Sequence, residues 1–224
     1  METFALVHGA WHGAWCWGPL VRELESRGHR AVAVDLPCDE ADAGCARYAE
    51  VVAAALGGLE EAIVVGHSLG GLTIPLVPAR RLVFLCALVP RPGLGAFELR
   101  AGEPEPFVAG FAESTVRDEL ERSSWPDEAT AIEQLYPDAP PELARAAFAR
   151  LRPQARRPSV EPSPLLAWPD VECSSILAQE DGALRPEWSR WTALERLGIE
   201  PLELRGGHSP MLARPDELAA LLTA

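Results

Sequence analysis

One serine lies between glycines at the end of a short apolar run. The segment Ile63–Gly71 reads IVVGHSLGG, which places Ser68 at the centre of a G-x-S-x-G motif. After a strand and before a helix, this motif forms a sharp turn, where small residues at Gly66 and Gly70 let the neighbouring backbone pass and leave the serine hydroxyl exposed. We therefore predict that Ser68 is a nucleophile. The simpler alternative, a glycine-rich turn with an incidental serine, is disfavoured by the flanking apolar run.

A serine hydroxyl is a weak nucleophile at neutral pH and needs a neighbouring base. Among the five histidines, His208 follows the last apolar run, Leu202–Leu204. If that run is a parallel strand, His208 lies at the same carboxyl edge of the sheet as Ser68, and the sites of open α/β sheets form at that edge. His208 is therefore the predicted base.

The other four histidines are weaker candidates for the base. His67 adjoins Ser68, but so sharp a turn should send its side chain elsewhere, and His29 begins a strand at the opposite edge. His8 and His12 share the loop after the first apolar run, and their i, i+4 spacing is a weak indication of zinc. Because no third ligand is near them in the sequence, we predict no metal site.

A third residue must orient the base, in the chain order serine, acid, histidine. Two aspartates flank the apolar run Ser175–Ala178. Asp181 follows the run and should lie at the catalytic edge, whereas Asp170 precedes it and should lie at the far edge. Asp181 is the prediction. Glu180 is the substitute, although a solvated loop carboxylate is the simpler interpretation of that residue.

Acyl transfer at a serine also needs hydrogen-bond donors for the negative oxygen of the tetrahedral intermediate. The backbone N–H of the residue after the nucleophile, here Leu69, supplies one donor, and the loop after the first strand supplies another. That loop reads His8-Gly9-Ala10-Trp11, and Ala10 is the expected second donor. An ordinary glycine turn before a helix is the alternative, and it loses force once Ser68 is accepted as a nucleophile.

Short apolar runs alternate with helical patterns along most of the chain. The runs are Phe4–Val7, Ala31–Val34, Ile63–Val65, Leu82–Leu88, Ser175–Ala178 and Leu202–Leu204. They are too short for helices, and their alternation with helices predicts buried parallel strands joined by right-handed crossovers. The expected fold class is α/β, with a doubly wound, mostly parallel sheet.

Four helices are expected between or after these strands. The first contains Leu20–Leu24, and the second contains Tyr48–Leu56 and should end at Gly57. The third has Trp188, Trp191 and Leu194 on one face. The last has Pro215 in its first turn and Leu218, Leu221 and Leu222 on its buried face. These helices should cover the sheet.

The interval from about residue 95 to residue 169 breaks the alternation. No clear strand occurs there, and the segments 107–120, 128–136 and 142–151 look helical. Ten prolines between residues 104 and 164 divide the interval into short pieces. Pieces of this kind fit a helical cap inserted into a single domain, residues 1–224, and lying over the edge of the sheet.

The cap is rich in aromatic residues and has no obvious basic cluster. We expect a pocket for a small, fairly apolar ligand, lined by Trp11, Phe107, Trp125 and Met211, although each aromatic residue taken alone is more often part of a core. Other aromatic residues of the cap are Phe111, Tyr136 and Phe148.

Composition excludes several function classes. The formal net charge is −13, which argues against a nucleic-acid partner. All 20 basic residues are arginine, so an internal Schiff base and a phosphate-loop lysine are excluded. The five cysteines contain no CxxC pair and indicate neither a disulfide framework nor a cysteine-rich zinc site. No signal-like start or membrane-length apolar run is present, so we expect a cytoplasmic protein with no membrane partner.

Extended motifs resemble those of the α/β-hydrolases that include plant methyl-ester esterases, hydroxynitrile lyases and many small bacterial hydrolases. The matching segments are LVHGAWHGAWCW at 6–17, VDLP at 34–37, GHSLGG at 66–71, LVFLCALVP at 82–90, and ED at 180–181 followed by PE at 186–187. The resemblance implies Ser68, Asp181 and His208 as a catalytic triad and Ala10 and Leu69 as oxyanion donors.

The sequence departs from the lyases of this group and has a short segment behind the nucleophile. In the lyases a threonine occupies the position of Gly9 and a lysine follows the catalytic histidine, whereas here Ser209 follows His208. Cyanohydrin cleavage is therefore disfavoured, and ester hydrolysis fits better. Pro75 and Pro78 should cut short the helix behind the nucleophile.

The function expected from these residues is hydrolysis of a small, fairly apolar carboxylic ester through an acyl-enzyme on Ser68, with no cofactor. A thioesterase, a lactonase or a hydrolase of a carbon–carbon bond next to a carbonyl would use the same triad. A non-catalytic ligand-binding protein on the same fold is the alternative from another class, and turnover on a panel of esters distinguishes it. The sequence carries no signal for an oligomeric state.

Overall fold

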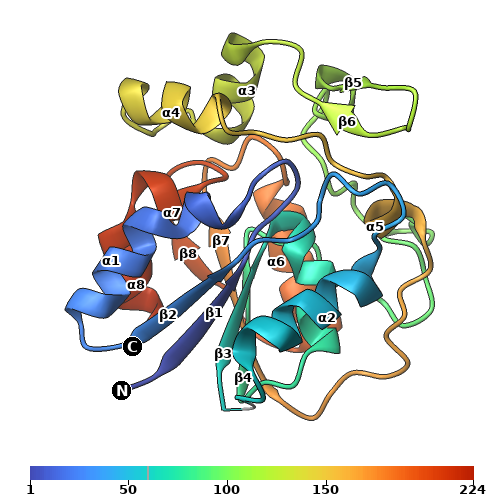
Figure 1. Cartoon of the computed structure of the whole chain (residues 1–224). Helices are drawn as coiled ribbons and strands as arrows, with labels where there is room; N and C mark the ends of the chain where they lie inside the picture. Colours follow the sequence, from blue (N-terminus) through green and yellow to red (C-terminus); the bar gives the residue numbers. More distant parts are fainter. Residues whose placement is uncertain (60) are drawn as a thin grey trace.

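A six-stranded parallel sheet forms the centre of the structure, a computed structural model that describes residues 1–59 and 61–224 (Figure 1). Its strands are β1 (Thr3–Val7), β2 (Arg30–Val34), β3 (Ile63–His67), β4 (Arg81–Leu85), β7 (Glu172–Ala178) and β8 (Leu202–Leu204). They lie in the order β2-β1-β3-β4-β7-β8, and every neighbouring pair is parallel. The predicted fold class and all six predicted strands are confirmed.

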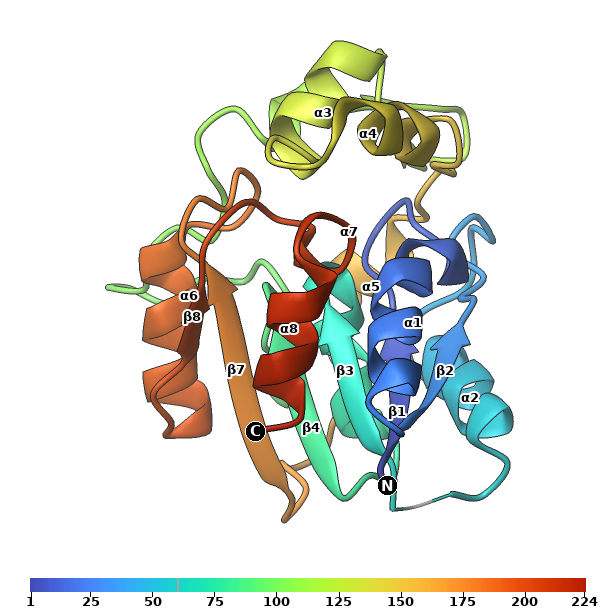
Figure 2. The same cartoon turned by 90° about the vertical axis from the view of Figure 1, so that its left-hand side faces the viewer.

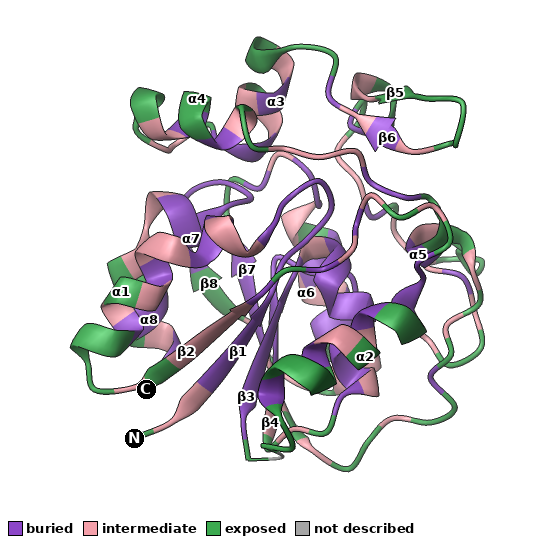
Figure 3. Ribbon diagram, in the orientation of Figure 1, coloured by how far each residue is buried: buried purple, intermediate pink, exposed green. Residues whose placement is uncertain are grey.

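The central strands are buried on both faces, which explains their nearly continuous apolar sequences. Successive side chains of a strand point to opposite faces. In β1, Leu6 contributes to one apolar core and Val7 to the other, and in β3, Val65 and Val64 divide in the same way. The sheet therefore separates two cores, and Figure 3 shows buried residues concentrated in its inner strands β1, β3 and β4.

Helices cover both faces of the sheet. Helix α1 (Gly18–Ser26) packs beside α8 (Pro215–Leu222) on one face, and α2 (Cys45–Leu56) covers the other (Figures 1 and 2). Helix α2 ends at Gly57, whose φ of 59° is left-handed, as its sequence predicted. In the described residues, no helix has the length and apolarity needed to cross a membrane.

The helix after β7 departs from its predicted face. Helix α6 (Pro186–Thr192) continues into a π-helical turn, η5 (Ala193–Leu197), and Leu194 is 41% exposed. A π turn holds more residues than an α turn, so it rotates the following side chains away from the face begun by Trp188. The guanidinium of Arg196 covers the rings of Trp188 and Trp191 instead.

The segment of residues 95–169 lies largely above the carboxyl ends of the strands (Figures 1 and 2). It contains α3 (Glu128–Leu135), α4 (Pro141–Phe148), the short α5 (Arg157–Val160) and a two-stranded antiparallel ribbon of β5 (Val116–Arg117) and β6 (Ser123–Ser124). The helices predicted over 128–136 and 142–151 are confirmed with small shifts of their ends. The ribbon contradicts the expectation that this interval holds no strand.

The helix predicted over residues 107–120 is wrong. Phe107 forms an antiparallel bridge with Leu184, Gly110 has a left-handed φ of 85°, and only a 3₁₀ turn, η4 (Ala112–Ser114), follows before β5. The apolar spacing of this segment arises because its side chains contact the body of the protein from an irregular backbone. Tertiary pairing has overridden a local helical pattern here.

The segment behind Ser68 consists of two 3₁₀ helices, η2 (Ser68–Leu72) and η3 (Ile74–Leu76). Pro75 lies in the first turn of η3 and Pro78 follows its end. The prediction that prolines cut short the helix behind the nucleophile is confirmed. The amide of Leu88 donates to the carbonyl of Ser68 at 3.0 Å and ties this turn to the loop after β4.

Candidate active site

Ser68 occupies a strained turn at the end of β3. Its φ of 50° lies in the left-handed region, which is uncommon for a residue with a side chain and occurs often at functional sites. A Cβ on Gly70 would lie 2.8 Å from the carbonyl oxygens of Val7 and His8. The turn therefore requires a glycine at position 70. Ser68 lies in the wall of a cavity.

His208 and Asp181 form a buried pair. The Nδ1 atom of His208 lies 2.9 Å from both carboxylate oxygens of Asp181, and the two side chains are each 2% exposed. Asp181 Oδ1 also accepts the backbone N–H groups of Ala183 at 2.8 Å and Leu184 at 2.9 Å. The carboxylate is thus held in place, and it selects the imidazole tautomer with the proton on Nδ1, which leaves Nε2 as an acceptor.

The structure distinguishes the three carboxylates that the sequence offered as partners for His208. Asp170 precedes β7 and is exposed, and Glu180 is exposed in the loop after that strand. Asp181 is the one of the three that contacts His208. Asp181 lies there because β7 and β8 are parallel, so the residues that follow the two strands, Asp181 and His208, lie at the same edge of the sheet.

His67 joins the loop of Ser68 to the loop of His208. Its Nε2–H donates to the carbonyl oxygen of His208 at 2.8 Å, and the centroids of the two rings are 4.8 Å apart. The side chain does point away from the cavity, but it packs against the residue predicted to act as the base. Burial lowers the pKa of His67 well below its ordinary value, so the ring is neutral.

His8 and His12 use both ring nitrogens in hydrogen bonds within the protein. His8 Nδ1 lies 2.8 Å from the carbonyl oxygen of Gly9, and its Nε2 accepts the backbone N–H of Leu36 at 2.9 Å. His12 Nδ1 lies 2.7 Å from the carbonyl oxygen of Ala10, and its Nε2 lies 2.7 Å from the hydroxyl of Tyr136. The zinc interpretation of their i, i+4 spacing is wrong because neither ring has a nitrogen left for a metal.

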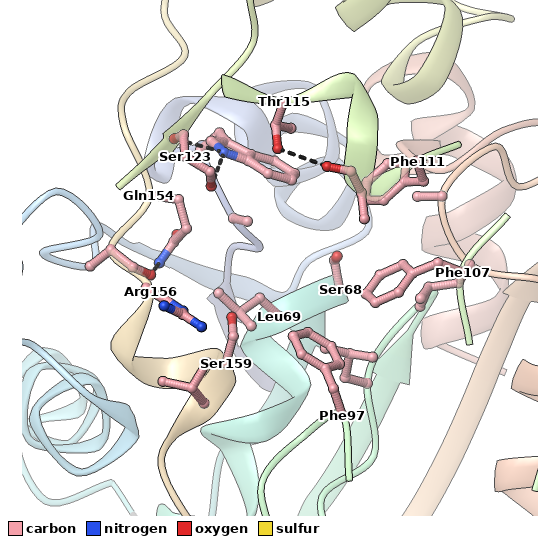
Figure 4. A pocket seen from close by; sticks show the side chains of 18 of the residues that line it. Ser68, Leu69, Phe97, Phe107, Phe111, Thr115, Ser123, Gln154, Arg156 and Ser159 are labelled. Carbon is pink, nitrogen blue, oxygen red and sulfur yellow. Dashed lines mark hydrogen bonds between the residues drawn. The ribbon is translucent and has the colours of Figure 1, made fainter. Parts of the chain in front are cut away.

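A cavity of about 240 Å³ opens at Ser68. Figure 4 shows Ser68 and Leu69 between an aromatic side, with Phe97, Phe107 and Phe111, and a polar side that includes Gln154, Arg156 and Ser159. The two sides come mostly from the 95–169 segment. The cavity therefore offers apolar packing on one side of Ser68 and hydrogen-bonding groups on the other.

Two of the four residues predicted for the pocket line this cavity, and two do not. Trp11 and Phe107 lie in its wall. Trp125 lies behind the wall, with its ring centroid 5.2 Å from that of Trp11, and Met211, in α7 (Pro210–Ala213), is fully buried in the core. Their large apolar side chains fill the layer that supports the wall.

Sequence reasoning missed other residues of the wall. Phe97 and Gln154 line the cavity, although nothing in their local sequence marks them. Arg117 and Arg156 also line it, although the cap sequence has no obvious basic cluster. Arg156 pairs with the carboxylate of Glu121 at 3.2 Å, so part of its charge is already compensated.

The chain is similar to known proteins over nearly its whole length. The family model described as "Alpha/beta hydrolase family" matches residues 4–221. The chain is 34% identical over 259 residues to "Probable esterase PIR7A" of Oryza sativa subsp. indica, covering 99% of this chain and 95% of the relative. It is 27% identical over 267 residues to "Methylesterase 3" of Arabidopsis thaliana, covering 99% and 94%.

Solved structures share the fold. A "Novel Pyrethroid Hydrolase from Sphingobium faniae JZ-2" superposes with a TM-score of 0.81 at 24% identity, covering 99% of this chain and 96% of that one. "Polyneuridine aldehyde esterase" superposes with a TM-score of 0.78 at 23% identity, covering 100% and 98%. At these identities the likeness concerns the architecture.

Proposed function

Because the chain belongs to the alpha/beta hydrolase family and is an esterase-like hydrolase, we propose that it cleaves a small, fairly apolar carboxylic ester through an acyl-enzyme on Ser68. The observation that carries the proposal is the buried His208–Asp181 pair, which His67 joins to the strained turn of Ser68 in the wall of a cavity with an aromatic side. Relatives with esterase names support the type of bond.

The proposed reaction runs in two halves. Ser68 Oγ attacks the ester carbonyl while His208 Nε2 takes the hydroxyl proton, and Asp181 stabilises the imidazolium that forms. Collapse of the tetrahedral intermediate breaks the ester C–O bond, and His208 gives the proton to the departing alcohol. Water then attacks the acyl-enzyme with the same base, which releases the carboxylic acid and restores Ser68.

Backbone N–H groups of Ala10 and Leu69 are the proposed donors to the oxyanion. Leu69 is the second residue of η2, where an N–H group has no partner within the helix. In the described part of the chain, no hydrogen bond uses the N–H of Ala10. Both residues line the cavity beside Ser68, which supports their assignment as donors to the oxyanion.

Gly9→Ala should lower kcat/KM for ester hydrolysis by about 100-fold, because a displacement of about 1 Å at a reacting centre has an effect of that order. A Cβ at Gly9 would lie 2.7 Å from Ser68 Cβ and 3.0 Å from His67 Nδ1, so the oxyanion loop or the nucleophile must move. Gly18→Ala is the control, since its nearest neighbour would be the Arg22 guanidinium at 3.8 Å. Steady-state kinetics on one ester checks the prediction, and equal rates in the two variants would contradict it.

Phe107→Ala should change ester preference, whereas Trp125→Ala should mainly change stability. Loss of the Phe107 ring removes apolar contact from the cavity wall and should lower the ratio of kcat/KM for a hexanoyl ester to that for an acetyl ester by about tenfold or more. Trp125 lies behind the wall and is 8% exposed, so its loss should lower the free energy of unfolding by about 3–5 kcal/mol.

Kinetics with two esters of one alcohol, together with urea unfolding of both variants, test whether Phe107 affects ester preference and Trp125 affects stability.

The same kinetic assay tests the proposed function when thioesters and lactones are included with the esters. We expect the highest kcat/KM on a carboxylic ester. Turnover of thioesters or lactones alone would contradict the proposed substrate class, and no turnover of any of them would contradict the proposed activity.

A further inference from the structure

Two fully buried histidines lie in the loop that follows β1 (residues 8–13), and the proposed reaction gives neither of them a proton to transfer. In each, one ring nitrogen is hydrogen-bonded to a carbonyl of that loop and the other is hydrogen-bonded to a residue outside the loop. We propose that His8 and His12 are positioning residues that hold two consecutive peptide planes of the loop and so aim the Ala10 N–H at the oxyanion. The inference rests on the proposed function, which assigns that role to Ala10.

His8 controls the peptide that carries the donor itself. The carbonyl of Gly9 and the N–H of Ala10 belong to one planar trans peptide, so the direction of the carbonyl fixes the opposite direction of the N–H. His8 Nδ1–H donates to that carbonyl at 2.8 Å. The other ring nitrogen accepts the N–H of Leu36, two residues beyond β2, at 2.9 Å, which fixes the tautomer and anchors the ring to the segment after β2.

His12 controls the next peptide. Its Nδ1–H donates to the carbonyl of Ala10 at 2.7 Å, so the planes on both sides of the Ala10 Cα are held. Trp11 follows with a φ of 64°, a left-handed conformation that a tryptophan keeps only when its surroundings impose it. The Arg152 N–H holds the carbonyl of Trp11 at 2.8 Å, and the two histidine hydrogen bonds hold the two peptides before it, next to the proposed oxyanion donor.

Tyr136 connects this arrangement to the 95–169 segment. Its hydroxyl, at the end of α3, donates to His12 Nε2 at 2.7 Å. Burial lowers the pKa of His8 to about 4 and that of His12 to about 3, so both rings stay neutral and each keeps one donor and one acceptor nitrogen. The segment above the sheet therefore helps to orient the catalytic loop as well as to line the cavity.

The test uses variants that remove or keep single hydrogen bonds. His8→Leu removes the donor to Gly9, whereas His8→Asn places an amide N–H near the position of Nδ1. Loss of one oxyanion donor costs about 10²–10³ in kcat, and we expect His8→Leu to fall in that range with KM near the wild-type value. His8→Asn should recover most of the loss. If His8 only stabilised the fold, its variants would not lower kcat while KM stayed near the wild-type value.

Tyr136→Phe is the milder variant and removes only the hydroxyl that anchors His12. It should lower kcat by about tenfold with KM unchanged, because His12 keeps its bond to Ala10 but loses its fixed tautomer. Tyr48→Phe is the matched control, since it removes another buried tyrosine hydroxyl, one that lies 3.1 Å from Gln154 Nε2 in the described structure. Its kcat should stay near the wild-type value.

Two outcomes would overturn the inference while the wild-type protein still hydrolyses esters. One is an equal kcat for Tyr136→Phe and Tyr48→Phe. The other is a His8→Asn variant that folds but is as slow as His8→Leu. If the wild-type protein hydrolyses no ester, the proposed function fails instead, so the two failures are distinguishable.

Discussion

Ser68→Ala should lower kcat/KM for ester hydrolysis by about 10⁶ while the protein stays folded. The variant lacks the attacking oxygen, so only positioning and the oxyanion donors remain to assist water. Alanine has the same difficulty as serine in adopting the left-handed φ of 50° at this position, and the turn should therefore keep its stability.

Ser159→Ala is the matched control for this variant. Ser159 lines the same cavity on its polar side, and its hydroxyl has no role in the proposed reaction (Figure 4). Steady-state kinetics on one ester, with thermal unfolding as the check of folding, compares the two variants. A Ser68→Ala protein that retains a substantial fraction of the wild-type rate would contradict the assignment of the nucleophile.

Asp181→Asn should lower kcat by up to about 10⁴ and leave KM nearly unchanged. The carboxylate accepts the Nδ1–H of His208 through both oxygens and is itself held by the N–H groups of Ala183 and Leu184. An amide in its place loses the charge that stabilises the imidazolium, and its own N–H favours the wrong imidazole tautomer. The cavity wall that we propose binds the ester does not include residue 181.

Asp170→Asn and Glu180→Gln are the controls for Asp181. Both residues are exposed, and Asp170 precedes β7, at the far edge of the sheet. The measurement is kcat for all three variants on one ester, with circular dichroism to confirm folding. A normal kcat for Asp181→Asn together with a large loss in either control would overturn the proposed triad.

Much of the proposed site was predictable because strand direction places residues at an edge. Ser68, Asp181 and His208 each follow a short apolar run, and parallel strands bring their carboxyl ends together. The choice of Asp181 over Asp170 needed only the direction of β7. Predictions of this kind depend on local sequence and on one topological rule, so the irregular segments of the chain did not affect them.

The wall of the cavity was less predictable because it depends on contacts between distant residues. The bridge between Phe107 and Leu184 replaces the helix expected over 107–120. Trp125 and Met211 have the size and apolarity of pocket residues, but the fold places them behind the wall. Spacing and composition do not distinguish a side chain that faces a cavity from one that supports it.

The roles of the buried histidines also depend on tertiary contacts. The spacing of His8 and His12 resembles that of metal ligands, and only the positions of Gly9, Ala10, Leu36 and Tyr136 show that all four ring nitrogens are engaged. The anchor on His12 lies 124 positions away in the sequence. A pattern within the loop carries no information about such a partner.

Covalent labelling of the nucleophile is the sharpest test of the proposed acyl-enzyme on Ser68. A fluorophosphonate probe reacts with a serine that is activated by a base and faces oxyanion donors, and peptide mass spectrometry identifies the residue that carries the adduct. We expect one adduct, on Ser68, with labelling abolished in Ser68→Ala and retained in Ser159→Ala. An adduct on Ser159 or Ser123 of the same cavity wall, or unchanged labelling of Ser68→Ala, would contradict it.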